Sequence, residues 1–418
     1  MARLQLSFLF PVCCALAVVI AVIQDTNCGG TASSGMAGAP PPSDGSPGPS
    51  SSGSAPGGSG AGGSSVPSYG GGTGASGQNS AAQFLYAAPV PNGGPISTRI
   101  NPQDGALAAV TNPPATPQNY PMMLAIDPSG TYLYETSQQG IWAYAIDRQS
   151  SQLSQITGSP YDGSKSFVSI TVDQLGKFVY ATGGMGVRGY SIQAGGGLKP
   201  MAGSPFPTAN PSNQFGPSRN LVIDQQDKFL YVTASVGILG FSIDPNGGAL
   251  SALGGSPFNA GNAPLSLVIT PSNRFLYETN LNDPTTYGYS VDQNKGVLTE
   301  ISGSPFKTLE GVAPLADNMT IALAGKFLYI ANRGTFSVDA NTGALARASS
   351  FLPGDWPVIN PTGNLLWAIT TDQNCWHCNL GVSAYTVDAN GNLTLVPNSF
   401  FIMNNSFSGG VVSLAITK

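Results

Sequence analysis

The chain has 418 residues, of which 9% are charged, and its 54 glycines and 34 prolines together exceed a fifth of the sequence. Charges this sparse exclude a coiled coil and a helix-rich enzyme with salt-bridged surfaces. The formal net charge is −5, from 16 basic and 21 acidic residues. This argues against a nucleic-acid partner, because binding to phosphates requires a basic face. The single histidine argues against the common histidine-based catalytic and metal sites, and we expect neither a metal nor a cofactor.

Residues 1–28 are predicted to be a targeting segment that exports the protein. Arg3 precedes the uncharged, mostly apolar residues 4–23, as in a signal peptide, and about 20 such residues can also span a bilayer as an uncleaved anchor. Cys28 follows this run and resembles the lipidated cysteine of a bacterial lipoprotein, although Asp25 to Asn27 stand where that motif has small apolar residues. Lipidation, an uncleaved anchor and ordinary cleavage stay open. In each case we expect a location in the cell envelope, the periplasm or on the extracellular surface, with membrane contact only through this segment.

Residues 29–80 are predicted to be a disordered tether. They are almost wholly glycine, serine, proline, alanine and threonine, and Asp44 is their only charge. So few apolar side chains cannot offset the entropy lost on ordering the chain. A coil of this length and composition spans roughly 40 Å, so it would hold a domain away from a membrane or wall.

Residues 81–418 contain seven copies of a short strand that ends in an aromatic residue. The seven copies are Phe84–Tyr86, Tyr132–Tyr134, Phe178–Tyr180, Phe229–Tyr231, Phe275–Tyr277, Phe327–Tyr329 and the variant Leu365–Trp367. An apolar strand and a tight turn precede most copies, and a third strand and a short fourth strand follow. Seven units of about 48 residues with four strands each predict an all-β, seven-bladed β-propeller.

The two ends of this region complement each other. The first copy starts at Phe84 without a preceding apolar strand, whereas residues 411–417 form such a strand with no copy after it. We therefore expect the C-terminal strand to complete blade one and to close the ring, which removes the exposed strand edges of an open array. A closed ring of this kind is expected to be a monomer.

The string Asp-Pro-Ser-Gly-Thr-Tyr-Leu-Tyr at residues 127–134, the Tyr-x-Ile-Asp-x-x-x-Gly-x-Leu pattern and the count of seven resemble the lactonase-type seven-bladed propellers. That family includes the propeller form of 6-phosphogluconolactonase and related cycloisomerases, and it borders the YVTN surface-layer propellers. Its enzymatic members carry a signature resembling Gly-Pro-Arg-His, with Asn-Glu after the next strand. Here the matching stretches are Gly216–Asn220 and Val232–Ala234, so the histidine and the glutamate are missing and Arg219 is the only charged residue left.

Two functions follow from this resemblance. The first is an exported, surface-tethered propeller that acts as a binding or interaction module. The alternative is a hydrolase that opens a sugar lactone, in which a carboxylate would replace the missing histidine as base. Fold alone does not decide between them.

The resemblance to a propeller also places a predicted ligand face. The loops that lead into the innermost strand and those after the second strand share one end of a propeller, where ligands usually bind. The residues that the repeat places there are Tyr120, Arg219, Asp317, Arg333, Asp355 and Trp356. Taken singly, each is better explained as a solvated loop residue. As a group they are the candidate face for a small-molecule, glycan or protein ligand.

Cys375-Trp376-His377-Cys378 is the sharpest local motif, and a CxxC pair indicates redox exchange, a metal site or a disulfide. The other cysteines, Cys13, Cys14 and Cys28, lie in the targeting segment, so a four-ligand zinc site cannot be completed from them. In an oxidising compartment the pattern favours a disulfide between Cys375 and Cys378, with His377 as an exposed loop residue.

Overall fold

The computed structural model describes residues 83–89, 94–110, 120–183, 186–206, 220–280, 283–308, 318–322, 325–349, 354–371, 380–402 and 411–417. All of them belong to one compact unit, Ser80–Lys418. The targeting segment and the tether predicted for residues 1–80 lie outside these residues. Nowhere in the described ranges is there a helix long and apolar enough to cross a membrane.

The described residues form seven antiparallel sheets, each with four strands in a continuous order. From the innermost strand outwards, blades 1 to 4 are β30 (Val411–Ile416), β1 (Phe84–Pro89), β2 (Ile96–Ile100) and β3 (Leu107–Ala109); β4 (Pro121–Ile126), β5 (Tyr132–Ser137), β6 (Gly140–Ile146) and β7 (Leu153–Gln155); β8 (Phe167–Val172), β9 (Phe178–Gly183), β10 (Gly186–Ile192) and β11 (Leu198–Pro200); β12 (Leu221–Ile223), β13 (Phe229–Ala234), β14 (Gly237–Ile243) and β15 (Leu250–Ala252).

Blades 5 to 7 follow the same plan. They are β16 (Pro264–Ile269), β17 (Phe275–Asn280), β18 (Thr285–Val291) and β19 (Leu298–Glu300); β21 (Met319–Ala322), β22 (Phe327–Ile330), β23 (Gly334–Val338) and β24 (Leu345–Ser349); β25 (Asp355–Ile359), β26 (Leu365–Thr371), β27 (Leu380–Val387) and β28 (Leu393–Leu395). Two short strands lie off this path: β20 (Phe306–Lys307) pairs with β18, and β29 (Phe401–Ile402) pairs with β27.

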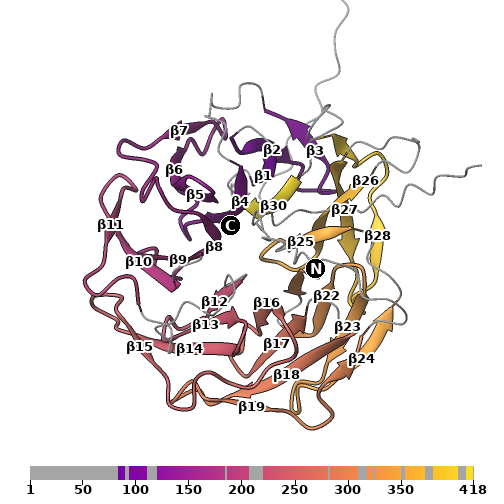
Figure 1. Cartoon of the computed structure of the whole chain (residues 1–418). Coiled ribbons are helices and arrows are strands. Elements are labelled where there is room, and N and C mark those ends of the chain that lie inside the picture. Colours follow the sequence, from indigo (N-terminus) through magenta and orange to yellow (C-terminus); the bar gives the residue numbers. More distant parts are fainter. Residues whose placement is uncertain are drawn as a thin grey trace, which may run out of the picture. The chain divides into compact units, whose positions relative to one another are not determined.

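The sheets close into a ring. Each innermost strand contacts the next, in the order β30, β4, β8, β12, β16, β21, β25 and back to β30 (Figure 1). The C-terminal strand β30 pairs antiparallel with β1, and the backbone N–H of Phe84 donates to the Thr417 hydroxyl at 2.9 Å. The prediction of a seven-bladed propeller with four strands per blade, sealed by the C-terminal strand, is confirmed.

The hydrophobic core lies between the blades. Seven clusters of buried side chains occur in the described part of the chain, and each joins two neighbouring blades. The second strand of a blade is covered on both faces, so every residue of β9, β13 and β17 is buried. The outermost strand touches only one neighbour, and in β11 only Leu198 is buried. This difference explains why the second strand carries the aromatic motif by which the repeat is recognised.

One hydrogen bond links the aromatic residue that ends each motif to the following blade. In all seven blades its polar atom donates to a backbone carbonyl in the turn between the third and fourth strands of the next blade. The pairs are Tyr86 to Ser151, Tyr134 to Gly196, Tyr180 to Gly248, Tyr231 to Gly296, Tyr277 to Gly343, Tyr329 to Gly391, and the Trp367 indole N–H to Gly105, at 2.6 to 3.2 Å. The variant motif in blade 7 therefore keeps the link that closes the ring onto blade 1.

The same packing explains the glycine in these turns. Gly248 has a φ of 72°, and a Cβ atom there would lie 2.4 Å from the Met201 methyl group and 2.8 Å from the Phe178 ring. The first aromatic residue of one blade's motif thus lies against a glycine of the next blade, while the last one bonds to its carbonyl. The Phe-x-Tyr motif and the turn glycine recur together because they form one contact between blades; blade 2 is the exception, where Ser151 takes the glycine position with a φ of 61°.

Candidate functional site

The predicted ligand face lies at the end of the ring where the innermost strands begin. In the antiparallel registers, the first residue of an innermost strand pairs with the last residues of the second strand, so their loops share this end. Of the six residues predicted there, the structure describes Tyr120, Arg333, Asp355 and Trp356, while Arg219 and Asp317 lie outside the described residues.

Two aromatic residues at this end have left-handed backbone conformations. Tyr120, which is 43% exposed, has a φ of 46°, and the half-buried Trp356 has a φ of 47°. Bulky residues rarely adopt positive φ, and the residue before a proline is normally extended, yet Pro121 and Pro357 follow directly. These residues lie in or next to β4 and β25, which both contact β30. The two strained aromatics therefore flank the innermost strand of blade 1.

A polar cluster joins Trp356 to blade 6. The half-buried carboxylate of Asp355 accepts hydrogen bonds through Oδ1 from the Trp356 backbone N–H at 2.8 Å and from the Asn318 side-chain amide at 2.9 Å. Asn318 precedes β21, and its carbonyl accepts the N–H of Ala331 at 2.9 Å. Asp355 and Trp356 are consecutive in the chain, and the structure brings Asn318, which the sequence did not single out, against Asp355.

Arg333 has a different environment. It is 2% exposed, and its guanidinium donates to the backbone carbonyls of Thr285 at 2.9 Å and Asp283 at 2.7 Å and to the Thr308 hydroxyl at 2.9 Å. Asp283 and Thr285 belong to blade 5, and Thr308 lies in the connection from blade 5 to blade 6. In this arrangement Arg333 holds two blades together. The predicted ligand face then retains Tyr120, Trp356 and Asp355 among the described residues, with Asn318 beside Asp355.

Two buried carboxyl groups were missed by the sequence interpretation. Glu135 and Glu278 directly follow the motif tyrosine in blades 2 and 5, and both are 0% exposed. A tyrosine hydroxyl donates to each, from Tyr144 at 3.3 Å and from Tyr289 at 3.4 Å. The signal was present: Ala87, Ala181, Val232, Ile330 and Ala368 occupy the same position in the other blades, so an acidic residue there is exceptional.

Glu278 is the more perturbed of the two. Burial raises its pKa to about 8, against a backbone hydrogen bond from Gly261 and the one from Tyr289, which both lower it. Its Oε1 atom has no hydrogen-bond partner among the described residues. A carboxyl group with this pKa is largely protonated at neutral pH. It is also fully buried between blades 4 and 5.

Asp162 is an ionised carboxylate near the same end of the ring. Its Oδ2 atom accepts hydrogen bonds from Arg188 at 3.1 Å and from the Tyr190 hydroxyl at 2.6 Å, and Lys165 lies 3.3 Å from Oδ1. Partial burial raises the pKa of Asp162, but the hydrogen bond from Tyr190 and the charge of Arg188 outweigh it and hold the pKa below its ordinary value. A carboxylate stabilised in this way is a poor general base.

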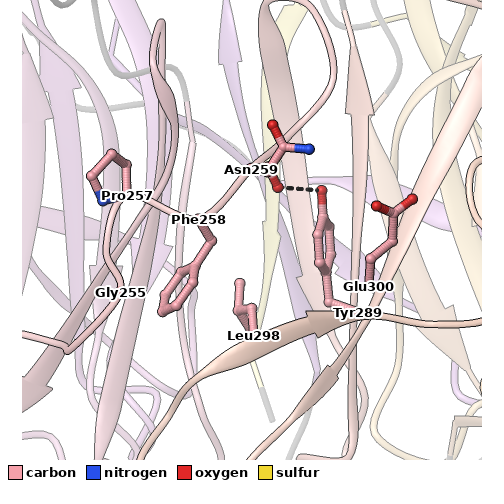
Figure 2. A pocket seen from close by; sticks show the side chains of 7 residues that line it. All are labelled: Gly255, Pro257, Phe258, Asn259, Tyr289, Leu298 and Glu300. Carbon is pink, nitrogen blue, oxygen red and sulfur yellow. Dashed lines mark hydrogen bonds between the residues drawn. The ribbon is translucent and has the colours of Figure 1, made fainter.

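A cavity of about 160 Å³ opens beside the connection between blades 4 and 5. Its lining residues are Gly255, Pro257, Phe258, Asn259, Tyr289, Leu298 and Glu300 (Figure 2). The Tyr289 hydroxyl donates to the Asn259 backbone carbonyl at 2.9 Å, as the dashed line in Figure 2 shows. None of the predicted ligand-face residues lines this cavity, so it is distinct from that face.

The Cys375–Cys378 motif, His377 and Cys28 lie outside the described residues. The disulfide and the lipidation therefore stay predictions. The same holds for the stretch Gly216–Arg219, where the resemblance places the enzymatic signature.

The fold and the packing between blades define a closed, single-chain seven-bladed propeller. A family model described as "Lactonase, 7-bladed beta-propeller" matches residues 85–402. The chain belongs to this lactonase family of seven-bladed propellers. No curated protein sequence matches it significantly.

Solved structures of similar fold come from several bacteria. A proposed 6-phosphogluconolactonase of Bacteroides fragilis is 18% identical, with a TM-score of 0.63 over 82% of this chain and 99% of that one. Another from Bacteroides uniformis is 18% identical, with a TM-score of 0.64 over 81% and 100%. The periplasmic gluconolactonase of Pseudomonas aeruginosa is 16% identical, with a TM-score of 0.59 over 81% and 99%. At these identities the likeness concerns the fold.

Proposed function

We propose that this protein is a lactonase-family propeller that is exported, held at the cell surface by residues 1–80, and binds a sugar or a similar polar ring compound at its ligand face. The observation that carries the proposal is the pair of aromatic residues in left-handed conformations, Tyr120 and Trp356. Backbone strain of this kind costs about 1 to 3 kcal/mol. Ala263 before Pro264 has the same left-handed conformation at the start of blade 5, so Tyr120 and Trp356 are distinguished by their aromatic side chains.

The neighbouring polar groups suit such a ligand. Small-molecule sites combine apolar and aromatic walls with a few oriented polar groups. Asp355 and Asn318 supply a carboxylate and an amide next to Trp356, and they hold each other in place. A ring compound with several hydroxyl groups can stack on the exposed ring of Tyr120 and donate to the Asp355 carboxylate, while Trp356 packs partly against the core between blades 7 and 1.

The described groups support binding rather than turnover. Opening a lactone requires a base that activates water and donors for the developing oxyanion. The histidine and glutamate of the enzymatic signature are missing from the sequence. Among the described carboxyl groups, the ionised Asp162 is bound by Arg188 and Tyr190, and Glu135 and Glu278 are buried. The carboxylate on the ligand face is Asp355, which accepts hydrogen bonds from Asn318 and from its own chain neighbour.

A second candidate is the hydrolysis of a sugar lactone. The family match and the gluconolactonase activities named for the structural neighbours favour it, and the periplasmic location named for one neighbour agrees with export. In this case a base would come from the ligand face or from the region around Arg219. The two candidate functions share a class of ligand. They differ in whether the protein breaks the ester bond of a lactone ring.

Binding and turnover can be separated on the purified full-length protein. Calorimetric titration with neutral monosaccharides and with gluconate should give saturable binding. Tyr120→Ala should weaken it about tenfold, which corresponds to one aromatic contact, and Tyr120→Phe should retain it. Leu175→Ala, on the opposite end of the ring, is the matched control. If δ-gluconolactone opens with saturable kinetics above the buffer rate and Arg219→Ala abolishes this activity, the hydrolase is correct and the binding-only proposal is wrong.

A further inference from the structure

The end of the ring opposite the ligand face carries a repeated hydrogen-bonding device. We call it the turn face, because there each innermost strand turns into the second strand. Asp173 follows β8, and its Oδ1 atom accepts the backbone N–H groups of Lys177 at 2.6 Å and Phe178 at 2.7 Å. Asp224 follows β12 and accepts those of Lys228 and Phe229 in the same way, at 2.6 and 2.8 Å. The second carboxylate oxygens differ: the Oδ2 atom of Asp224 also accepts the backbone N–H of Gln226 at 3.3 Å, whereas that of Asp173 accepts none among the described residues.

The turn of the following blade reaches back to each of these turns. Asp227 in blade 4 has a φ of 55°, and its Oδ1 atom accepts the N–H of Gln174 in blade 3 at 2.8 Å. Asn273 in blade 5 has a φ of 56°, and its Oδ1 atom accepts the N–H of Gln225 in blade 4 at 2.8 Å. Asp227 and Asn273 therefore occupy equivalent positions with the same backbone conformation and the same acceptor role.

The two positions differ in what the rest of the side chain can do. The amide nitrogen of Asn273 donates to the Oδ2 atom of Asp224 at 3.3 Å. Asp227 has a second carboxylate oxygen in place of that donor. Correspondingly, the Oδ2 atom of Asp173 is buried and has no hydrogen-bond partner among the described residues, and the residue is 0% exposed.

Two like charges thus face each other across the contact between blades 3 and 4. Burial raises the pKa of Asp173, and the charge of Asp227 raises it further, while the backbone hydrogen bonds and Lys177 lower it. Burial raises the pKa of Asp224 as well, and the charge of Asp227 adds to this rise. A buried carboxylate without a partner costs free energy unless a positive species neutralises it.

We propose that a hard cation, with calcium as the preferred ion, binds between the carboxylates of Asp173 and Asp227 and joins blades 3 and 4. Oxygen ligands suit calcium, which takes six to eight of them in flexible geometry. Asp227 is half-exposed, so the ion reaches the pair from solvent. No group of three or more acidic, histidine or cysteine side chains is arranged to hold a metal within the described residues. Water therefore supplies the remaining ligands, and the site belongs to the weak class, with dissociation constants of about 10⁻⁴ to 10⁻³ M.

Thermal unfolding of the full-length protein at neutral pH tests this site. Calcium at about ten times the dissociation constant should raise the Tm of the unmodified protein by about 2 °C relative to chelator, from the linkage between binding and stability and the entropy of unfolding of a domain this size. Asp227→Asn should place an amide opposite Asp173, as Asn273 does opposite Asp224. This variant should melt higher than the unmodified protein in chelator and should lose the calcium response.

Asn273→Asp is the matched reciprocal variant. It creates a second carboxylate pair with Asp224, so it should lower the Tm in chelator and enlarge the rise produced by calcium. The proposal is overturned if calcium leaves the Tm of the unmodified protein unchanged while acidification raises it, which would show a shared proton instead. It is also overturned if Asp227→Asn keeps the full calcium response.

Discussion

Glu278→Gln tests the electrostatics of the core most directly. The carboxyl group of Glu278 lies between blades 4 and 5, where the backbone of Gly261 and the hydroxyl of Tyr289 donate to it. Burial raises its pKa from 4.5 to about 8. Glutamine has the same shape and can accept the same hydrogen bonds, but it carries no charge at any pH. The substitution therefore isolates the cost of keeping an ionisable group in this place.

The direction of the effect follows from proton binding. Between pH 4.5 and 8 the folded protein retains the Glu278 proton while the unfolded chain releases it, so stability falls as the pH rises through this window. Glu278 thereby lowers the free energy of unfolding by about 3 kcal/mol at pH 7. This loss levels off at about 5 kcal/mol above pH 8, at 1.36 kcal/mol per pKa unit. The roughly 340 residues of the propeller lose about 0.7 kcal/mol per degree near the Tm. Glu278→Gln should therefore raise the Tm by about 4 °C at pH 7.

Differential scanning calorimetry between pH 4 and 9 measures this difference. The two proteins should melt together near pH 4 and diverge up to pH 8. Glu300→Gln removes an exposed carboxylate on β19 of the same blade, and its Tm should follow that of the unmodified protein throughout. A Tm difference between Glu278→Gln and the unmodified protein that does not change with pH would refute the reasoning, because only titration of Glu278 makes it pH-dependent.

Three further predictions concern closure and the cysteine pair. Deleting residues 411–418 removes β30 and exposes the edge of β1 with which it pairs, so light scattering should show aggregation or calorimetry a large fall in Tm; a monomer that melts unchanged would contradict the observed closure. Trp367→Tyr can still donate to Gly105, as tyrosine does in the other blades, and should be about 1 kcal/mol more stable than Trp367→Phe in chemical unfolding; equal stabilities would argue that this bond contributes nothing. Replacing Cys375 and Cys378 by serine should cost roughly 2 kcal/mol or less, and mass spectrometry of the non-reduced protein should find the pair oxidised rather than as free thiols.

The candidate site was predictable only in part. The repeat predicted that Tyr120, Asp355 and Trp356 lie at the end of the ring where the innermost strands begin, and they do lie there, because position along a strand determines the end at which a residue lies; whether a ligand binds at this end stays a prediction. The same reasoning grouped Arg333 with them, yet its guanidinium bonds to blade 5. Position in a repeat predicts at which end of the ring a residue lies. It does not predict the direction in which a long side chain points. The left-handed backbone conformation at Tyr120 and Trp356 could not be predicted from the sequence either, because it arises from how the loops join the innermost strands.

The sequence by itself determined the number of blades, the order of their strands and the identity of the closing strand. These features depend on local patterns that recur along the chain: the Phe-x-Tyr strand, the turn glycine and the unpaired strand at residues 411–417. The tertiary structure decided which polar groups are buried and what faces them, as in the isolation of Glu278 and the opposition of Asp173 and Asp227. These environments depend on contacts between segments apart in the chain: Gly261 and Tyr289 face Glu278, and Asp227 of the next blade faces Asp173. A repeat shows which position faces a neighbour, but only the folded ring shows which chemical group the neighbour presents.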